Sequence, residues 1–202
     1  MFKKVLKFIV IIPFLVAFQC DEELESDITF NDYTVNITPQ SSFSIDDTIW
    51  ISGIVSSQAY DSSINDSIFY DRYQGDVLSI MKLIAPTELS NCIDAIDNFE
   101  LIVQLGEISF FPRCENAEMT VTPELSSDNL SFRYRIGLKP LGTGDFVISW
   151  QNSNLQNENR NESIIDKYPI ENHPNQIGFN KCGKVSWRLL DESNKEFYFS
   201  VE

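Results

Sequence analysis

The stretch SFRYRIGLK, residues 131–139, decides the fold class. Phe132, Tyr134, Ile136 and Leu138 alternate there with polar residues or glycine. A β-strand places alternate side chains on opposite faces of a sheet, whereas a helix would scatter these four apolar groups around its axis. The stretch therefore predicts a strand that turns one face to a hydrophobic core and the other to solvent.

The residues after this stretch predict a hairpin. PLGTGD (140–145) is dense in turn-forming residues, and Phe146, Ile148 and Trp150 then resume the alternation. A second hairpin is predicted at the end of the chain, where the polar DESNK (191–195) separates the apolar alternation over 185–189 from that over 197–201.

Strand patterns also precede this stretch, and helical patterns are weak. Alternating or β-branched apolar residues, which favour strands, occur at 33–37, 47–55, 76–84 and 98–105. Short helices are predicted over 90–97 and 161–168, the second with Asn161 at its N-cap.

Many short strands separated by turns predict an all-β fold, an antiparallel β-sandwich with one or two short helices. The pattern up to Trp150 resembles an immunoglobulin-like sandwich, although the spaced Cys-Trp-Cys set of true immunoglobulin domains is absent. We expect one domain over 28–202, in which 151–202 adds strands or forms a small appended unit that covers one face. Trp50, Trp150 and Trp187 all fall on strand patterns and are expected in the core.

The N-terminus has two marks of a secretion signal. Lysines near the start precede an apolar run from Phe8 to Phe18, which is shorter than the about 20 residues needed to span a membrane. The run ends at Cys20, and this arrangement resembles the N-terminus of a bacterial lipoprotein, with Gln19 as in the looser lipobox of Bacteroidota-type proteins. The acidic residues that follow resemble the surface-export signal of that group: Asp21, Glu22, Glu23 and Glu25.

This resemblance implies a signal peptide at 1–19, a lipid anchor on the thiol of Cys20 that includes acyl chains such as palmitate, and an acidic tether at 20–27. It also implies an outer-membrane location at the cell surface. The tether reaches at most about 25 Å, at about 3.3–3.6 Å per residue, which keeps the body close to the membrane. The alternative is an ordinary signal peptide with Cys20 in a disulfide.

The charge argues against one class of partner. Removal of residues 1–19 takes away three lysines and no acids, which leaves 12 basic and 30 acidic residues and a net charge of −18 with histidine neutral. Binding to the phosphate backbone needs lysine and arginine, so no nucleic-acid partner is expected. The acidity serves solubility, or the capture of cations and basic partners.

Three further cysteines lie in the body of the chain, and an oxidising compartment favours one disulfide among them. Cys92–Cys114 closes the shortest loop and is favoured, with Cys114–Cys182 as the alternative, because spacing does not fix connectivity. A zinc site is not expected, since the chain has no C-x-x-C motif and a single histidine, His173.

Catalytic motifs are missing from the sequence. It has no G-x-S-x-G, phosphate loop, dinucleotide fingerprint or H-E-x-x-H. His173 lies in a proline-containing turn, and acids are the commonest surface group, so neither a Ser-His-Asp system nor a glycosidase pair of carboxylates is marked out. A hydrolase remains an alternative, but a protein without catalytic activity is expected.

The most suggestive segment for binding is AYDSSINDSIFYDRYQGD, residues 59–76, which mixes aromatic residues with aspartates. Loop aromatics stack on sugars or anchor a partner protein, and carboxylates accept hydrogen bonds or a cation. The candidate ligand residues are Tyr60, Tyr70, Tyr73, Asp66 and Asp71.

Other interpretations of this segment remain open. Phe69 and Tyr70 would close the end of the core while the aspartates solvate the loop. Calcium would suit the acids, but the order of an EF-hand loop is missing, so no cofactor is expected. Asp66-Ser67-Ile68 resembles the D-[ST]-aliphatic glycosylation sites of Bacteroidota-type proteins, as does Asp47-Thr48-Ile49, and Ser67 is the better candidate because Thr48 begins a buried strand.

Together these features predict a non-catalytic cell-envelope lipoprotein that acts as a binding or structural module. An envelope protein or a glycan is the expected partner, and a glycan-binding protein would use the 59–76 segment. A structural subunit would instead expose an apolar patch larger than a few hundred Å².

Overall fold

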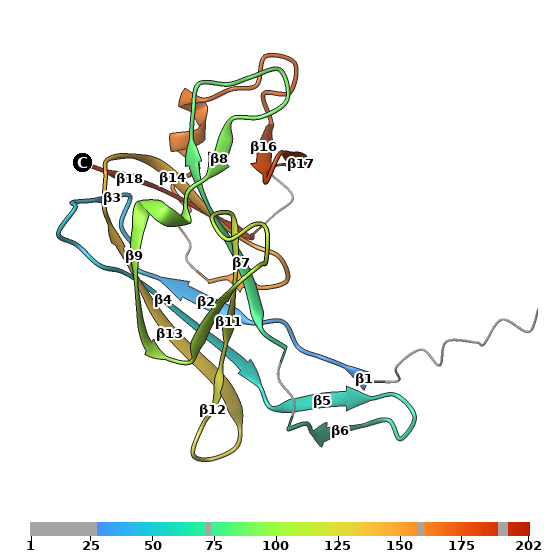
Figure 1. Cartoon of the computed structure of the whole chain (residues 1–202). Coiled ribbons are helices and arrows are strands. Elements are labelled where there is room, and N and C mark those ends of the chain that lie inside the picture. Colours follow the sequence, from blue (N-terminus) through green and yellow to red (C-terminus); the bar gives the residue numbers. More distant parts are fainter. Residues whose placement is uncertain (1–27, 72–73, 157–159, 190–193) are drawn as a thin grey trace, which may run out of the picture.

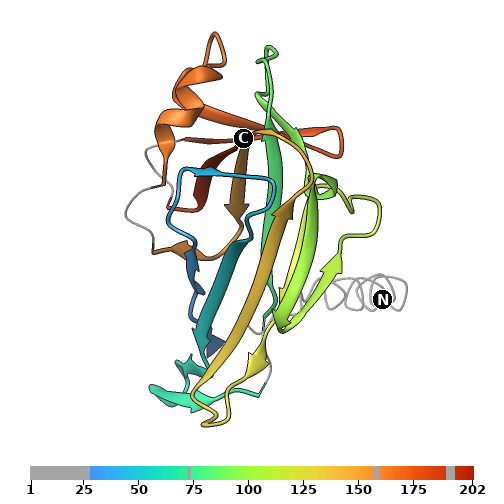
Figure 2. The ribbon, with the colours of Figure 1, turned by 90° about the vertical axis from the view of Figure 1, so that its left-hand side faces the viewer.

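The computed structural model describes residues 28–71, 74–156, 160–189 and 194–202. These residues form two β-sheets that pack face to face, together with a small third sheet at one end (Figures 1 and 2). The predicted signal peptide, Cys20 and the tether lie outside the described residues.

The larger sheet has nine strands among the described residues, most of them antiparallel to their neighbours. Its main path runs in the order β17 (Lys184–Leu189), β16 (Gln176–Lys181), β8 (Cys92–Asp94), β7 (Asp76–Leu83), β14 (Gly144–Trp150), β18 (Glu196–Val201) and β3 (Ser42–Phe43). A branch leaves β7 through β11 (Glu118–Thr122) to β10 (Glu107–Phe110). The β16–β8 and β18–β3 pairs are parallel.

The opposite sheet is built around β13 (Ser131–Pro140). Its order is β12 (Glu124–Leu125), β13, β4 (Ile49–Ser56), β2 (Thr34–Ile37) and β15 (Asn154–Leu155), and β9 (Phe99–Leu105) pairs with β13. Here the β2–β15 pair is parallel. The small sheet contains β1 (Ile28–Thr29), β5 (Gln58–Asp61) and β6 (Asp66–Phe69).

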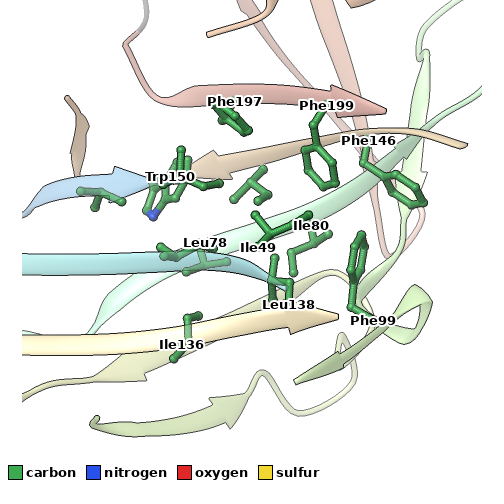
Figure 3. Packing of buried hydrophobic residues seen from close by; sticks show 14 of the residues in the cluster. Ile49, Leu78, Ile80, Phe99, Ile136, Leu138, Phe146, Trp150, Phe197 and Phe199 are labelled. Atoms are coloured by element: carbon green, nitrogen blue, oxygen red, sulfur yellow. The ribbon is translucent and has the colours of Figure 1, made fainter. Parts of the chain in front are cut away.

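The main core fills the space between the two large sheets (Figure 3). On β13, Phe132, Tyr134, Ile136 and Leu138 are buried, whereas the two intervening arginines are exposed, as the alternation predicts. Full burial of one such side chain contributes about 1.5–3 kcal/mol. The all-β, immunoglobulin-like sandwich expected from the sequence is therefore the fold observed, with three parallel strand pairs among the antiparallel ones.

The first predicted hairpin is wrong, because β13 and β14 lie in different sheets. β13 pairs with β4 and β9, and β14 pairs with β7 and β18. The turn residues 141–143 carry the chain across the sandwich, so Leu138 and Phe146 approach the same core from opposite sheets. Turn-forming residues favour a reversal of the chain, but they do not determine whether the two strands pair or face each other.

The second predicted hairpin is also wrong. β17 pairs with β16, which precedes it, and β18 pairs with β14 and β3. The β16–β17 loop consists of Cys182 and Gly183, both with positive φ (47° and 78°), as a type I′ turn requires. This two-residue turn fixes the pairing of β17, and the sequence analysis missed it.

The helical predictions are met only in part. Within 90–97, Cys92–Asp94 forms β8 and only the end of the segment enters a 3₁₀-helix, η1 (Ile96–Asn98). Pairing with β7 and β16 overrides the weak helical pattern. The second segment forms a 3₁₀-helix, η2 (Glu162–Lys167), and Asn161 is its N-cap residue but makes no side-chain capping bond.

The segment after Trp150 both adds strands and covers a face. β16, β17 and β18 join the larger sheet, while Ile164 and Ile165 of η2 pack against Met81, Val147 and other residues on the sheet's outer face. No helix in the described part of the chain is long and apolar enough to cross a membrane.

Candidate binding site

A small pocket opens where the third sheet meets the end of the sandwich. Its volume is about 50 Å³, compared with the about 10–15 Å³ that one water molecule needs, so it admits several waters or one small polar group. Its described lining comes from the 30–33 segment, the junction of β4 and β5, residues 70 and 74–76, Phe132, and residues 152–153.

Asp76 forms the polar centre of this pocket. It opens β7, and its side chain is only 2% exposed. The Tyr134 hydroxyl donates a hydrogen bond to Oδ2 at 2.5 Å, and the Ser153 hydroxyl donates to Oδ1 at 2.5 Å. Because Tyr134 belongs to the opposite sheet, this network joins the two sheets where the pocket begins.

Burial dominates the electrostatics of the network. Loss of water around the carboxyl raises the pKa of Asp76 to about 6, although the hydrogen bonds from Ser153 and Tyr134 oppose the shift. Burial and the adjacent Asp76 carboxylate also raise the pKa of Tyr134 well above its usual value, so the phenol keeps its proton and remains the donor.

Gly53 on β4 makes room for Tyr134. The two residues are directly paired between β4 and β13, and a Cβ on Gly53 would fall only 2.1 Å from Cε1 of the Tyr134 ring. The glycine therefore lets the ring lie flat across the strand and brings its hydroxyl to Asp76.

Two aromatic rings and several backbone bonds form the rim. Phe30 and Tyr70 meet edge to face with ring centroids 4.9 Å apart. The Tyr70 N–H donates to the Ser57 carbonyl at 2.9 Å, and the Tyr33 hydroxyl donates to the Gln74 carbonyl at 2.7 Å. The rim is thus a mixed surface of aromatic edges and amide groups, suited to a ligand with both apolar and polar faces.

The structure brings only part of the predicted ligand set together. Tyr70 lines the pocket, but Tyr60 does not. Ala59, its neighbour on β5, takes the inward position, and the Tyr60 hydroxyl instead donates to Asn65 Oδ1 at 2.6 Å. Asp66 and Asp71 are exposed and not among the lining residues. Tyr73 lies outside the described residues.

The other features predicted in this segment fall on its outer surface. One interpretation expected Phe69 to close the end of the core, but its side chain is 52% exposed and does not do so. Ser67 is exposed on β6, and Thr48 is half-buried just before β4. No group of three described carboxylates in 59–76 lies close enough to hold a calcium ion.

Sequence reasoning missed most of the pocket. Phe30, Ser153 and Asn152 come from segments with no binding pattern. Tyr134, which bonds the lining residue Asp76, was recognised only as a core residue. One signal was available: Asp76 stands at the start of a largely apolar strand, where a buried carboxylate needs partners.

The disulfide joins Cys114 to Cys182, with the two Cα atoms 5.7 Å apart. This was the alternative in the sequence analysis, and the favoured Cys92–Cys114 pairing is wrong. Cys92 points from β8 into the cluster beneath η2, where its thiol donates to the Gly178 carbonyl at 3.3 Å. Burial raises its thiol pKa far above the usual range, so Cys92 is an unreactive core residue.

Asp94 lies beside this disulfide but does not make a metal site with it. Its carboxylate accepts the Cys182 N–H at 3.0 Å, and the two neighbouring sulfur atoms are bonded to each other. Sulfur must be present as a thiolate to bind a metal, so the oxidised form offers Asp94 alone.

The remaining predicted residues lie away from the pocket lining. Trp150 is buried, as expected, but Trp50 is half-buried beneath the Arg135 guanidinium, and Trp187 is 42% exposed. The Trp187 ring packs against His173, with centroids 4.6 Å apart, and its N–H donates to the Leu89 carbonyl. His173 therefore contributes no group to the pocket.

No protein-family model matches the sequence, and no curated protein matches it. Among solved structures, the chain is similar to a non-cellulosomal cohesin from the hyperthermophilic archaeon Archaeoglobus fulgidus. The match has 7% sequence identity and a TM-score of 0.27, and covers 85% of this chain and 92% of that one. Such a low score supports no argument about function.

Proposed function

We propose that this protein is a non-catalytic lipoprotein of the cell envelope, anchored through Cys20 at the outer membrane surface, whose sandwich binds an envelope partner at the Asp76 pocket. The N-terminal sequence supports the anchor: a basic head, an apolar core that stops at Cys20 and an acidic run after it.

The hydrogen bonding of Asp76 supports binding without catalysis. A general acid or base must present a lone pair or a proton to the substrate. Each oxygen of Asp76 accepts a short bond from a protein hydroxyl, one from Tyr134 and one from Ser153, and the residue is only 2% exposed, so it offers a substrate little access. The carboxylate therefore acts as a scaffold that shapes the pocket and holds the sheets together.

The size of the pocket indicates the kind of contact. A cavity of about 50 Å³ takes one small polar group, so it would hold a single protruding group of a larger ligand. The second candidate, a glycan-binding function, is favoured by the Phe30–Tyr70 pair at the rim, because aromatic rings stack on the apolar faces of sugars.

A pull-down from intact cells tests both parts of the proposal. Wild type should recover a specific partner and should fractionate with the outer membrane, whereas Cys20→Ser should lose the membrane fraction. Tyr70→Ala should reduce partner recovery, or binding on a glycan array, at least about tenfold if the rim contributes a typical hot-spot contact.

Tyr60→Ala is the matched control, because Tyr60 lies on the same hairpin but outside the pocket. Equal loss of binding in both variants would contradict the assignment of the site. Chemical turnover of the recovered ligand that disappears in Asp76→Asn would instead support the hydrolase alternative.

A further inference from the structure

The end of the molecule nearest the tether carries exposed apolar side chains. Ile64 in the β5–β6 turn, Phe69 on β6 and Leu130 before β13 are 60%, 52% and 64% exposed. We call these three residues the apolar tip. Figures 1 and 2 both place β5, β6 and the β12–β13 turn at one end of the sandwich.

Backbone contacts hold two parts of the tip side by side. Ser57, between β4 and β5, donates its N–H to the Leu130 carbonyl at 3.1 Å and its hydroxyl to the Asn129 carbonyl at 2.6 Å. Phe69 is paired with Gln58, the next residue. Leu130 and Phe69 are therefore fixed on either side of the same short segment.

The first described residues fix where the tether joins the body. Ile28 pairs with Asp61 and Thr29 pairs with Tyr60, so β1 is a strand of the sheet that carries the tip. Seven residues separate Cys20 from Ile28, and at about 3.3–3.6 Å per residue they reach about 25 Å at most. A lipid on Cys20 must therefore lie close to this end.

The opposite end of β13 lies far from the tip. Leu141 follows β13 and is 60% exposed, nearly as much as Leu130, which precedes the strand. β13 separates the two leucines by eleven residue steps, or roughly 37 Å at about 3.4 Å per residue. The two positions are thus matched in chemistry and exposure but differ in their distance from the anchor.

The charges near the tip determine which kind of lipid surface it can bind. Asp61 and Asp66 flank the turn that carries Ile64, and Asp128 accepts the Leu130 N–H. Arg133 lies close enough to Asp128 to act on its charge, so the aspartates outnumber this cation. Hydrogen bonds from Ser63 and Ser126 lower the pKa of Asp61 and of Asp128, so both stay ionised at neutral pH. An anionic lipid surface would repel this end, whereas a zwitterionic one would not.

We propose that the apolar tip enters the interface of a zwitterionic lipid surface beside the anchor, so that the protein stands upright with the β5–β6 hairpin toward the membrane. This inference rests on the proposed lipid anchor at Cys20. An interfacial segment buries its apolar side chains about 5–10 Å into the boundary between headgroups and acyl chains, and isolated Leu, Ile and Phe side chains suit that depth.

Fluorescent labels at the two leucines test the orientation. Leu130→Cys and Leu141→Cys each add one reactive thiol, because Cys92 is buried and Cys114 is bonded to Cys182. The full lipidated protein is placed in phosphatidylcholine vesicles that contain nitroxide-labelled lipid. Fluorescence at position 130 should fall at least about twofold, with little change at position 141.

Two results would overturn the inference: no quenching at either position, or equal quenching at both. If the apolar tip binds a protein partner and not lipid, neither position should be quenched. Replacement of all three tip residues by serine should weaken the binding of the Cys20→Ser chain to these vesicles at least about tenfold, as expected for the loss of several buried apolar groups. Unchanged binding would contradict the insertion of these three side chains into the lipid interface.

Mass spectrometry of the same protein separates this inference from the proposed function. An unmodified Cys20 would disprove the lipid anchor. The two labelled positions are then compared in a Cys20→Ser chain held on nickel-chelating vesicles by a histidine tag placed directly before residue 20. Quenching confined to position 130 would support insertion of the apolar tip into the lipid interface. Absence of quenching at position 130 would contradict this insertion, whether or not Cys20 is lipidated.

Discussion

The Tyr134 hydroxyl on one sheet donates a 2.5 Å hydrogen bond to the Asp76 carboxylate on the other. This bond crosses the sandwich at the point where the apolar core gives way to the pocket. A buried carboxylate is costly unless it is hydrogen-bonded, so the stability of this end depends on the pair.

Tyr134→Phe should destabilise the protein by about 1–3 kcal/mol, because it leaves one Asp76 oxygen without its donor in a buried site. Chemical denaturation would measure the change in the free energy of unfolding. Tyr60→Phe removes a hydroxyl that bonds Asn65 at the surface, and it should cost much less. Equal losses of unfolding free energy in the two variants would show that the bond between the sheets stabilises the protein no more than a surface hydrogen bond does.

The stability should depend on pH through Asp76. Its pKa of about 6 in the folded protein lies above the about 3.9 of an unfolded chain, so the folded state binds the proton more tightly. This contribution is fully present below about pH 4 and is lost as the pH rises through 6, a change of about 2–3 kcal/mol.

Asp76→Asn isolates that effect from the other acids. The pKa values of several of them are lowered in the folded protein, so their contributions to stability change with pH in the opposite sense. The unfolding free energy of wild type minus that of the variant should fall between pH 4 and pH 7 and then stay level. A difference that is flat, or that rises over this range, would mean that the pKa of Asp76 is not raised.

Gly53→Ala should destabilise the protein by about 1–3 kcal/mol through overpacking against the Tyr134 ring. Gly142→Ala provides the control, because a Cβ there meets no atom within 4 Å. Thermal melts of the two variants should therefore diverge, with Gly142→Ala close to wild type. A shift of similar size in both would argue that Tyr134 does not lie across Gly53.

The Cys114–Cys182 bond closes a loop of 68 residues, and its removal by double substitution to serine should cost up to about 4 kcal/mol in the chain-entropy model. Peptide mapping without reduction should recover these two cysteines as one cross-linked pair and Cys92 as a free thiol that reacts only after unfolding. A cross-link that contains Cys92 would refute the arrangement of β8 and the β16–β17 turn.

The sequence predicted those features that are local to a single strand. The alternation in 131–139 identifies both the strand and its buried face, because side-chain direction along a strand is a local property. The two hairpins were wrong because pairing depends on partners far along the chain: β14 meets β7 and β18, and β18 meets β14 and β3. The Cys182–Gly183 turn did hold a local signal for pairing, and it was overlooked.

The candidate site was partly predictable for the same reason. Tyr70 was selected as a loop aromatic, and it lines the pocket. The role of Asp76 depends on Tyr134 and Ser153, which are 58 and 77 residues away in the sequence, so no local pattern reveals it. Tyr60 was predicted in the set because it is another aromatic residue among the aspartates of 59–76. Strand alternation places it on the face of β5 opposite to Ala59, away from the pocket.

β18 lies between β14 and β3, and its Phe197 and Phe199 are fully buried in the core. The sandwich therefore cannot close around its core until β18 has been synthesised and has joined the sheet.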